Sequence, residues 1–284
     1  MIEMKTRQEL TTWIKKQKQL GSTIGFVPTM GFLHEGHLSL VEQAKKKADI
    51  VVMSIFVNPL QFGEGEDYES YPRDHDRDKE LADSHGVDVL FSPGVEEMYP
   101  RPMSTTLVVH EGTDVLCGQS RPGHFNGVAT VVLKLLQITS ADYAYFGLKD
   151  AQQVAIIQRM VEDFHLATEI IPIDIVRESD GLAKSSRNVN LNLEERQEAP
   201  EIYSCLKDAS RKTQNGDFTN STDLEDWVRL QLQKKLTGKI DYVQVLEFPS
   251  LKAPKQLEGK ILLATAVYYK RARLIDNIVI EIKG

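Results

Sequence analysis

The sequence predicts an α/β protein in which a doubly wound parallel sheet is followed by a smaller α+β domain. Short apolar runs rich in β-branched residues recur through the first two thirds of the chain, and helix-like stretches with apolar residues three or four positions apart separate them. After about Asn190 the pattern changes to two polar amphipathic helices and then to strand-like segments. We therefore expect a sheet domain over residues 1–177 and a C-terminal α+β domain over residues 178–284.

The elements of the first domain are expected in a regular order. Residues 1–19 lack the apolar core of a secretory signal and predict a short charged helix with Leu10, Trp13 and Ile14 on one side. Buried strands are expected at residues 23–28, 49–57, 87–93, 141–147 and 169–176. Helices are expected at residues 37–47, 74–85, 128–137 and 150–164. Right-handed crossovers then bring active residues to the carboxyl ends of the strands.

The second domain is expected to begin with helices at residues 194–215 and 221–236. Strand-like stretches follow at residues 240–248 and 261–280. The joint falls in "RESDGLAKSSRN", whose Gly, Ser and Asn content predicts a loop, and "NPLQFGEGEDYESYPRD" after the second strand predicts another.

Composition restricts the class of protein. Apolar residues make up 41% and charged residues 26% of the 284 residues, and no apolar run approaches the roughly 18 residues of a membrane span. Cys117 and Cys205 stand far apart without a CxxC motif, so we expect no disulfide framework, no structural zinc and a cytoplasmic location. The net charge of −7 argues against a nucleic-acid partner, whereas small anionic substrates fit a cleft that gathers cations.

His34 and His37 lie where a predicted strand opens into a helix, in "PTMGFLHEGHLSLV". The start of a helix offers unpaired backbone N–H groups and the positive end of its dipole, so phosphate binding is the leading interpretation. A zinc pair is weakly supported, because "HEGH" has a spacing of three and a glycine where HExxH requires a helix. Histidines that only cap the helix or pack in the core remain an alternative.

A second candidate segment, "DGLAKSSRN", spans Asp180 to Asn188. It places two hydroxyls, a lysine and an arginine in four consecutive positions, and such donors suit a polyphosphate. A solvated interdomain linker is the alternative interpretation.

Together "HxGH" and "KSSR" resemble the two signatures of the class I synthetase and nucleotidylyltransferase superfamily. With "SIFVNPLQFGEGEDYESYPRD", "RPGHFNGVATVVLKL", "YFGLKDAQQ" and the ending "ARLIDNI", the chain resembles the pantothenate synthetase family over nearly its whole length. The resemblance implies a Rossmann-like fold, a C-terminal domain that covers the active site, a homodimer, and the use of ATP and Mg²⁺. It also implies ligation of pantoate to β-alanine through a pantoyl adenylate, with release of pyrophosphate and then AMP.

The resemblance carries over to individual residues. It implies that His37, the presumed proton donor, and His34 act in catalysis with Lys149, Ser185, Ser186 and Arg187. Pantoate and β-alanine contacts are implied for Asn58, Gln61 and Gln153. The implied ATP-binding residues are Met30, Gly31, Phe32, Leu33, His34, Glu35, Gly36, His37, Gly147, Leu148, Lys149, Asp150, Val176, Lys184, Ser185, Ser186 and Arg187.

The chain departs from the family pattern at Leu148 and Lys184, where the family has "GEKD" and "GLAMSSRN". No residue is assigned as the base for β-alanine, and no protein metal ligand is assigned. The two glycine-containing loops after Asn58 and after Gly118 are candidate lids. A nucleotidylyltransferase of the same superfamily and a non-catalytic nucleotide-binding module are the alternatives. AMP formed only after amine addition distinguishes the ligase from both.

Overall fold

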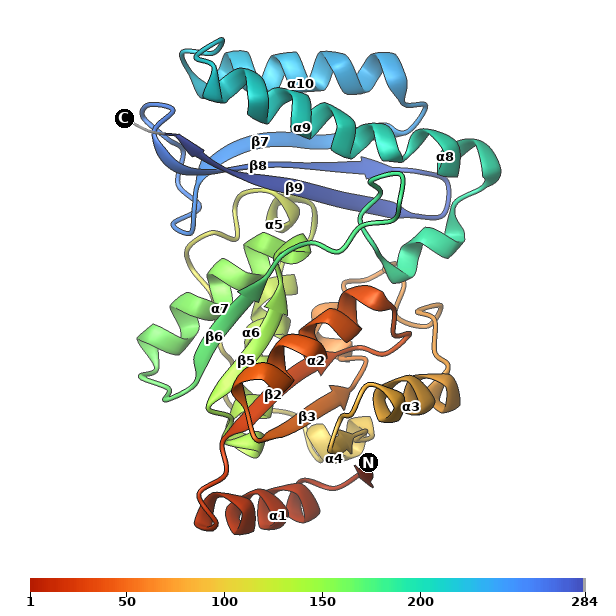
Figure 1. Cartoon of the computed structure of the whole chain (residues 1–284), viewed down its shortest axis with the longest axis vertical. Helices are drawn as coiled ribbons and strands as arrows, with labels where there is room; N and C mark the ends of the chain where they lie inside the picture. The colour runs from red at the N-terminus through yellow and green to blue at the C-terminus, as the bar shows by residue number, and fades with distance from the viewer. Residues whose placement is uncertain (283–284) are drawn as a thin grey trace. The chain divides into compact units, whose positions relative to one another are not determined.

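The computed structural model describes residues 1–282 (Figure 1). The chain forms two compact units. The first contains residues 1–110, 121–148 and 156–174, and the second contains residues 111–120, 149–155 and the chain from residue 175 onward. The second unit thus includes residues 111–120, 149–155 and 175–177, which the sequence analysis assigned to the first domain.

A parallel six-stranded sheet forms the centre of the first unit. Its strands are β1 (Ile2–Met4), β2 (Ile24–Thr29), β3 (Ile50–Ile55), β4 (Val89–Phe91), β5 (Tyr143–Gly147) and β6 (Glu169–Ile173). Their order is β1-β4-β3-β2-β5-β6, and all neighbouring pairs are parallel. The five predicted strands are confirmed, whereas β1 was not predicted. The order reverses between β2 and β5, and ligands of such sheets bind at this switch point.

Helices connect the strands at nearly the predicted positions. They are α1 (Arg7–Gln19), α2 (Glu35–Lys47), α3 (His75–Ser84), α4 (Val95–Met98), α5 (Cys117–Ser120), α6 (His124–Thr139) and α7 (Ala151–Asp163), with 3₁₀ turns η1 (Pro59–Gln61) and η2 (Leu148–Asp150). The four-residue helices α4 and α5 were not predicted. No helix formed by residues 1–282 is long and apolar enough to cross a bilayer.

Side-chain alternation along the strands supplies both faces of the sheet with apolar groups. Val27, Met53 and Leu90 belong to one buried cluster together with residues of α2 and α3. Their strand neighbours, such as Phe26 and Val52, are fully buried and point to the opposite face, because successive side chains of a strand alternate. Helix α6 contacts β2, and α1 contacts α6. The prediction of a doubly wound α/β sheet is therefore confirmed.

From residue 175 onward the second unit contains a three-stranded antiparallel sheet and three helices. Its elements are η3 (Ser186–Asn190), α8 (Leu193–Glu198), α9 (Pro200–Gln214), α10 (Ser221–Lys235), β7 (Lys239–Glu247), β8 (Gly259–Tyr268) and β9 (Arg273–Ile282). Leu206 of α9, Val228 of α10 and Leu263 of β8 share one core. The predicted single helix over residues 194–215 is wrong. The structure has two helices there, because α8 is capped at Ala199 and Pro200, which lacks an N–H, begins α9.

Candidate active site

The chain leaves β2 through a turn that delivers His34 to the start of α2. Gly31 and Phe32 both have left-handed backbone conformations, with φ of 84° and 50°. A Cβ at Gly31 would lie 2.9 Å from a carboxylate oxygen of Asp78 and 3.0 Å from Ile55. The turn therefore needs glycine both for its backbone angle and for the close approach of these neighbours.

His34 and His37 form a reciprocal cap at the N-terminus of α2. The Nδ1 atom of His34 accepts a hydrogen bond from Gly36 N at 3.1 Å, and Nδ1 of His37 accepts one from His34 N at 3.3 Å. The ring centroids are 4.1 Å apart. A neutral imidazole that accepts at Nδ1 carries its proton on Nε2, so each ring is a hydrogen-bond donor at Nε2. The capping interpretation is therefore correct for Nδ1 and is compatible with phosphate binding at Nε2.

Asn58 and Gln61 lie together after β3, next to Met30. The Nδ2 atom of Asn58 donates to Gln61 Oε1 at 3.2 Å and to Gly127 O at 3.1 Å. Its Oδ1 accepts from Leu60 N at 3.3 Å and from the Tyr99 hydroxyl at 2.8 Å. These bonds use both N–H donors and both oxygen lone pairs of the Asn58 amide. The role of Asn58 is therefore to hold the side chain of Gln61 in place.

Gln61 has a different environment from Asn58. Its side chain is 8% exposed, and its Nε2 lies 3.0 Å from the Met30 sulfur. A thioether is a weak acceptor, so Gln61 retains capacity to bind a polar ligand.

A charged cluster that the sequence analysis missed surrounds the backbone of Gln61. Arg121 forms a bidentate ion pair with Glu66, and Gln61 O is contacted by Arg121 Nη2 at 3.3 Å and by His124 Nδ1 at 2.7 Å. Burial of Glu66 opposes its ionisation, but Arg121 holds the pKa of that carboxyl below its ordinary value. Glu66 and Arg121 come from the two glycine-containing loops that the sequence analysis regarded as lids. Their juxtaposition could not be read from either loop alone.

The segment after β5 carries the next candidate residues. Gly147 ends β5, and Leu148, Lys149 and Asp150 form η2. Lys149 Nζ lies 3.4 Å from the nearer Asp150 carboxylate oxygen, and the Lys149 carbonyl accepts a 3.0 Å hydrogen bond from Asn277 Nδ2. Asn277 belongs to the "ARLIDNI" ending. That motif therefore has a structural task within the second unit, because it holds the main chain that presents Lys149.

Gln152 and Gln153 are neighbours in sequence with opposite environments. Gln152 is buried, accepts from Cys117 N at 3.0 Å and donates to Gly112 O and Val115 O at 2.8 Å each. The half-buried Gln153 side chain makes no hydrogen bond with residues 1–282. Gln152 therefore stabilises the fold, whereas Gln153 has its amide available for a ligand.

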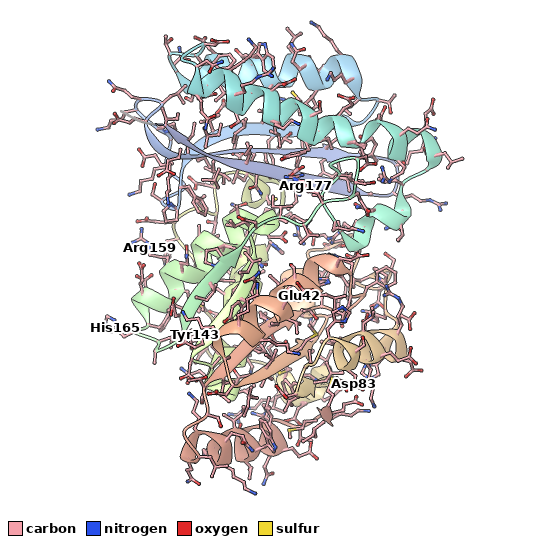
Figure 2. All side chains as sticks on the ribbon, in the orientation of Figure 1. Glu42, Asp83, Tyr143, Arg159, His165 and Arg177 are labelled. Atoms are coloured by element: carbon pink, nitrogen blue, oxygen red, sulfur yellow. The ribbon has the colours of Figure 1, made fainter. Side chains whose placement is uncertain are left out.

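The "RESDGLAKSSRN" segment forms a hairpin-like turn and is not a solvated linker. Lys184 N donates to Val176 O at 2.9 Å, so the predicted adenine contact and the predicted phosphate clamp are adjacent. Arg177, labelled in Figure 2, binds Asp276 of β9 with two hydrogen bonds of 2.7 and 2.9 Å. These contacts fix the turn to the antiparallel sheet of its own unit.

The predicted clamp residues follow this turn directly. Ser185 Oγ caps η3 by accepting from Arg187 N at 3.3 Å, and Ser186 is buried. Lys184 Nζ lies 2.8 Å from a Glu178 carboxylate oxygen. Glu178 therefore offsets part of the charge that Lys184 adds to the family pattern.

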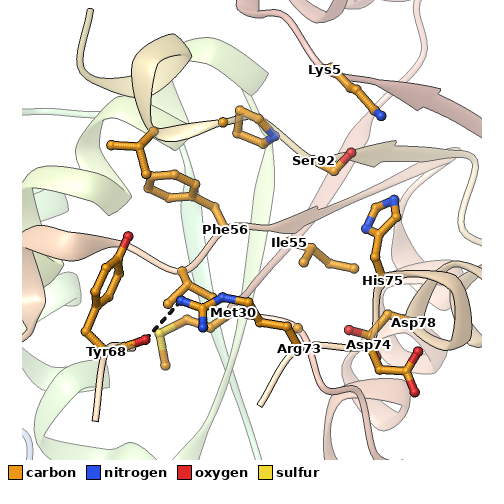
Figure 3. Close-up of a pocket in the computed structure, with 15 residues that line it drawn as sticks. Lys5, Met30, Ile55, Phe56, Tyr68, Arg73, Asp74, His75, Asp78 and Ser92 are labelled. Atoms are coloured by element: carbon orange, nitrogen blue, oxygen red, sulfur yellow. Dashed lines mark hydrogen bonds between the residues drawn. The ribbon is translucent and has the colours of Figure 1, made fainter. Parts of the chain in front are cut away.

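A pocket of about 380 Å³ lies at the carboxyl ends of β2, β3 and β4 in the first unit (Figure 3). Met30 and Gly31 of the predicted ATP segment line it, together with Phe56. Arg73, which donates to Tyr68 O at 2.9 Å, lines it from the loop after β3. Met30 and Gly31 are the predicted site residues that line this pocket, whereas His34, His37, Asn58 and Gln61 are not among its described lining residues. The pocket lies at β2, β3 and β4, on one side of the switch point between β2 and β5.

The resemblance implies that Mg²⁺ takes part in the reaction. Among residues 1–282 there is no group of three or more His, Cys, Asp or Glu side chains that could hold a metal. Mg²⁺ is commonly held by substrate phosphates with one or two protein carboxylates.

Comparisons with known proteins give one consistent result. A sequence profile of the family described as Pantoate-beta-alanine ligase matches residues 3–279. Pantothenate synthetase from Halalkalibacterium halodurans is 53% identical over 280 residues, which are 99% of each chain. The pantothenate synthetase of Caldicellulosiruptor bescii is 52% identical and is covered completely, as is this chain.

Solved structures agree with the sequence relatives. Pantothenate synthetase from Thermus thermophilus superposes with a TM-score of 0.92 at 41% identity, covering 98% of this chain and 99% of the other. Pantoate-beta-alanine ligase from Francisella tularensis, solved in complex with beta-gamma ATP and β-alanine, gives 0.79 at 38% identity, covering 98% and 97%.

Proposed function

Because the chain belongs to the pantoate-beta-alanine ligase family, we propose that it joins pantoate to β-alanine with ATP through a pantoyl adenylate. The family match along nearly the whole chain carries this conclusion. In the first half-reaction a pantoate carboxylate oxygen forms a bond to the α-phosphorus, and the bond to pyrophosphate breaks. In the second, the amine of β-alanine attacks the activated carbonyl carbon, and the carbon–oxygen bond to AMP breaks.

The first half-reaction brings two anions together, so its barrier depends on positive groups near the phosphates. We assign this role to Lys149 and Arg187, with Lys184 contributing less because Glu178 pairs with it. The Nε2–H groups of His34 and His37 would donate to the departing pyrophosphate. The α2 N-terminus adds partial positive charge in the same place.

Pantoate carries one carboxylate and two hydroxyls. The amides of Gln61 and Gln153 can both donate to and accept from the hydroxyls without adding charge. Asn58 is assigned an indirect role, because its own hydrogen bonds are used to hold Gln61. Val176, Gly147 and Asp150 are assigned to the nucleoside side of ATP.

Three further assignments complete the proposal. Mg²⁺ would be carried by the triphosphate, where it would neutralise phosphate charge. The working form is a homodimer, so a sedimentation measurement should give a mass of about twice the 32.1 kDa of one chain. The location is the cytoplasm, where the buried thiols of Cys117 and Cys205 would stay reduced.

A two-step assay tests the function. The protein with ATP and pantoate should release pyrophosphate, and AMP should appear only after β-alanine is added. A stable nucleotide adduct that persists after amine addition would instead support the nucleotidylyltransferase alternative.

A further inference from the structure

A buried carboxylate on α3 holds the turn that precedes His34. Asp78 is 1% exposed, and its two carboxylate oxygens accept hydrogen bonds from consecutive backbone N–H groups. Phe32 N lies 2.6 Å from Oδ2, and Leu33 N lies 2.7 Å from Oδ1. Figure 3 shows Asp78 beside the pocket that Met30 also lines.

The local backbone explains why an acid is needed at this place. Left-handed conformations at Gly31 and Phe32 turn successive N–H groups toward one point, and such a concavity binds an anion. Leu33 is fully buried, so its N–H has no water to replace a lost acceptor. A buried donor left unpaired destabilises the folded state. An amide at position 78 would offer one oxygen and set its own NH₂ against the second N–H.

A second residue of α3 contacts the same turn. Arg77 Nη1 donates to Leu33 O at 3.1 Å, and its guanidinium lies 5.5 Å from the centroid of the Phe32 ring. Three backbone groups of Phe32 and Leu33 are therefore fixed by neighbouring side chains of one helix. Burial raises the pKa of Asp78, and the two amide hydrogen bonds and Arg77 oppose that shift.

We propose that Asp78 is a positioning residue for adenylate formation, because it fixes the turn that sets the direction of the His34 and His37 rings. His34 follows Leu33 directly and is the N-cap of α2, so a change in this turn moves both imidazoles. The inference rests on the proposed function in assigning those rings to the triphosphate. It adds a residue whose two carboxylate oxygens are bonded to the backbone of the turn, so we assign it a role through that backbone.

Asp78→Asn is the direct test, and Asp76→Asn on the exposed side of the same helix is the matched control. With ATP, pantoate and β-alanine all saturating, Asp78→Asn should lower the rate of pyrophosphate release at least tenfold. The KM for pantoate, measured with the other two substrates saturating, should change less than twofold. Asp76→Asn should stay within twofold of the wild type in both values. A normal turnover rate of folded Asp78→Asn, whatever its melting temperature, would overturn the proposal.

A spectroscopic measurement separates positioning from general destabilisation. The imidazole ¹⁵N resonances of His34 and His37 should shift in Asp78→Asn and stay unchanged in Asp76→Asn. This readout needs no turnover, so it also stands if the wild type releases no pyrophosphate and the proposed function itself fails. Unshifted resonances would show that the carboxylate does not set the rings.

A milder variant covers the case in which Asp78→Asn does not fold. The Arg77 side chain is 46% exposed, so Arg77→Ala should fold normally while losing the bond to Leu33 O. We expect about threefold slower pyrophosphate release at an unchanged melting temperature. An unchanged rate would contradict control of the turn by α3.

Discussion

At the scale of single residues, the chemistry depends on which nitrogen atoms and amides the fold already uses. His34 and His37 accept backbone hydrogen bonds at Nδ1, which directs their protons to Nε2. The side-chain amide of Gln152 forms hydrogen bonds with three backbone groups, whereas that of its neighbour Gln153 forms no hydrogen bond within residues 1–282. Adjacent residues of one type therefore have separable roles, and substitutions can distinguish them.

His37→Ala should slow adenylate formation by about 10²-fold, the usual loss for a group that stabilises developing charge. Removal of its Nδ1 acceptor also weakens the helix cap by about 1 kcal/mol, so the melting temperature should fall slightly. Pyrophosphate release and thermal unfolding give the two values. His165→Asn, at the exposed position beyond α7 (Figure 2), is the control and should change neither. A normal rate for His37→Ala would remove it from the mechanism.

Gln153→Ala should raise the KM for pantoate at least tenfold and leave the KM for ATP and the melting temperature nearly unchanged. Gln152→Ala should instead lower the melting temperature and leave both KM values nearly unchanged. It removes the partner of the buried Cys117 N, at about 1–3 kcal/mol, and of the half-buried carbonyls of Gly112 and Val115. Steady-state kinetics and thermal denaturation of both variants test the contrast. Equal effects of Gln153→Ala on both substrates would contradict its assignment to pantoate.

At the scale of elements, the N-terminal strand β1 depends on one carboxylate. Glu3 accepts from Lys79 at 2.7 Å and Ser92 at 2.8 Å and contacts His75 at 2.9 Å, so it links β1 to α3 and to the end of β4. The Lys79 hydrogen bond lowers the pKa of Glu3 to about 2, although burial opposes the shift. The ionised carboxylate therefore stabilises this edge of the sheet.

This pKa predicts the acid sensitivity of the edge. The pKa of Glu3 is lower in the folded protein than its ordinary value of 4.5. The stabilisation by the ionised Glu3 carboxylate is therefore complete above pH 4.5 and disappears as the pH falls toward about 2. Glu3→Gln should lower the unfolding free energy by about 2 kcal/mol at neutral pH, and the difference should vanish near pH 2. Melting curves against pH test this, with Glu42→Gln on the exposed face of α2 as control. A constant difference at all pH values would refute it.

The sequence predicted most elements, because hydrophobic periodicity is a local signal. Five strands of the parallel sheet and the helices between them followed from it. The three-residue β1 is too short to show a period, and the break at Pro200 interrupts an otherwise continuous amphipathic pattern. The contacts of Asp78 with Phe32 and of Arg121 with Glu66 join residues 46 and 55 positions apart. No local pattern reports such pairs, so these parts of the site required the structure.

At the scale of the whole molecule, an acidic chain must collect cations for a reaction between anions. The net charge is −7, yet Lys149, Lys184 and Arg187 occur in the two segments that follow β5 and β6. The helix N-terminus after β2 adds a further positive end. The proposed phosphate contacts therefore come from a few residues and do not depend on the overall net charge.

Because the adenylate intermediate is reactive, we expect a stoichiometric burst of pyrophosphate release. With ATP and pantoate alone, rapid-quench measurements should show one pyrophosphate per active site and then a much slower rate, because water must be kept from a bound adenylate. Addition of β-alanine should restore steady turnover. Continuous pyrophosphate release without the amine would contradict protection of the intermediate.

The most direct test of the account follows an oxygen atom. Pantoate labelled with ¹⁸O in its carboxylate should transfer one labelled oxygen to AMP, because that oxygen attacks the α-phosphorus and leaves with AMP when the amine attacks the carbonyl. Mass spectrometry of the products measures the transfer. Label in AMP is the predicted result, whereas unlabelled AMP, or ADP with labelled phosphate, would contradict activation of pantoate at the α-phosphate.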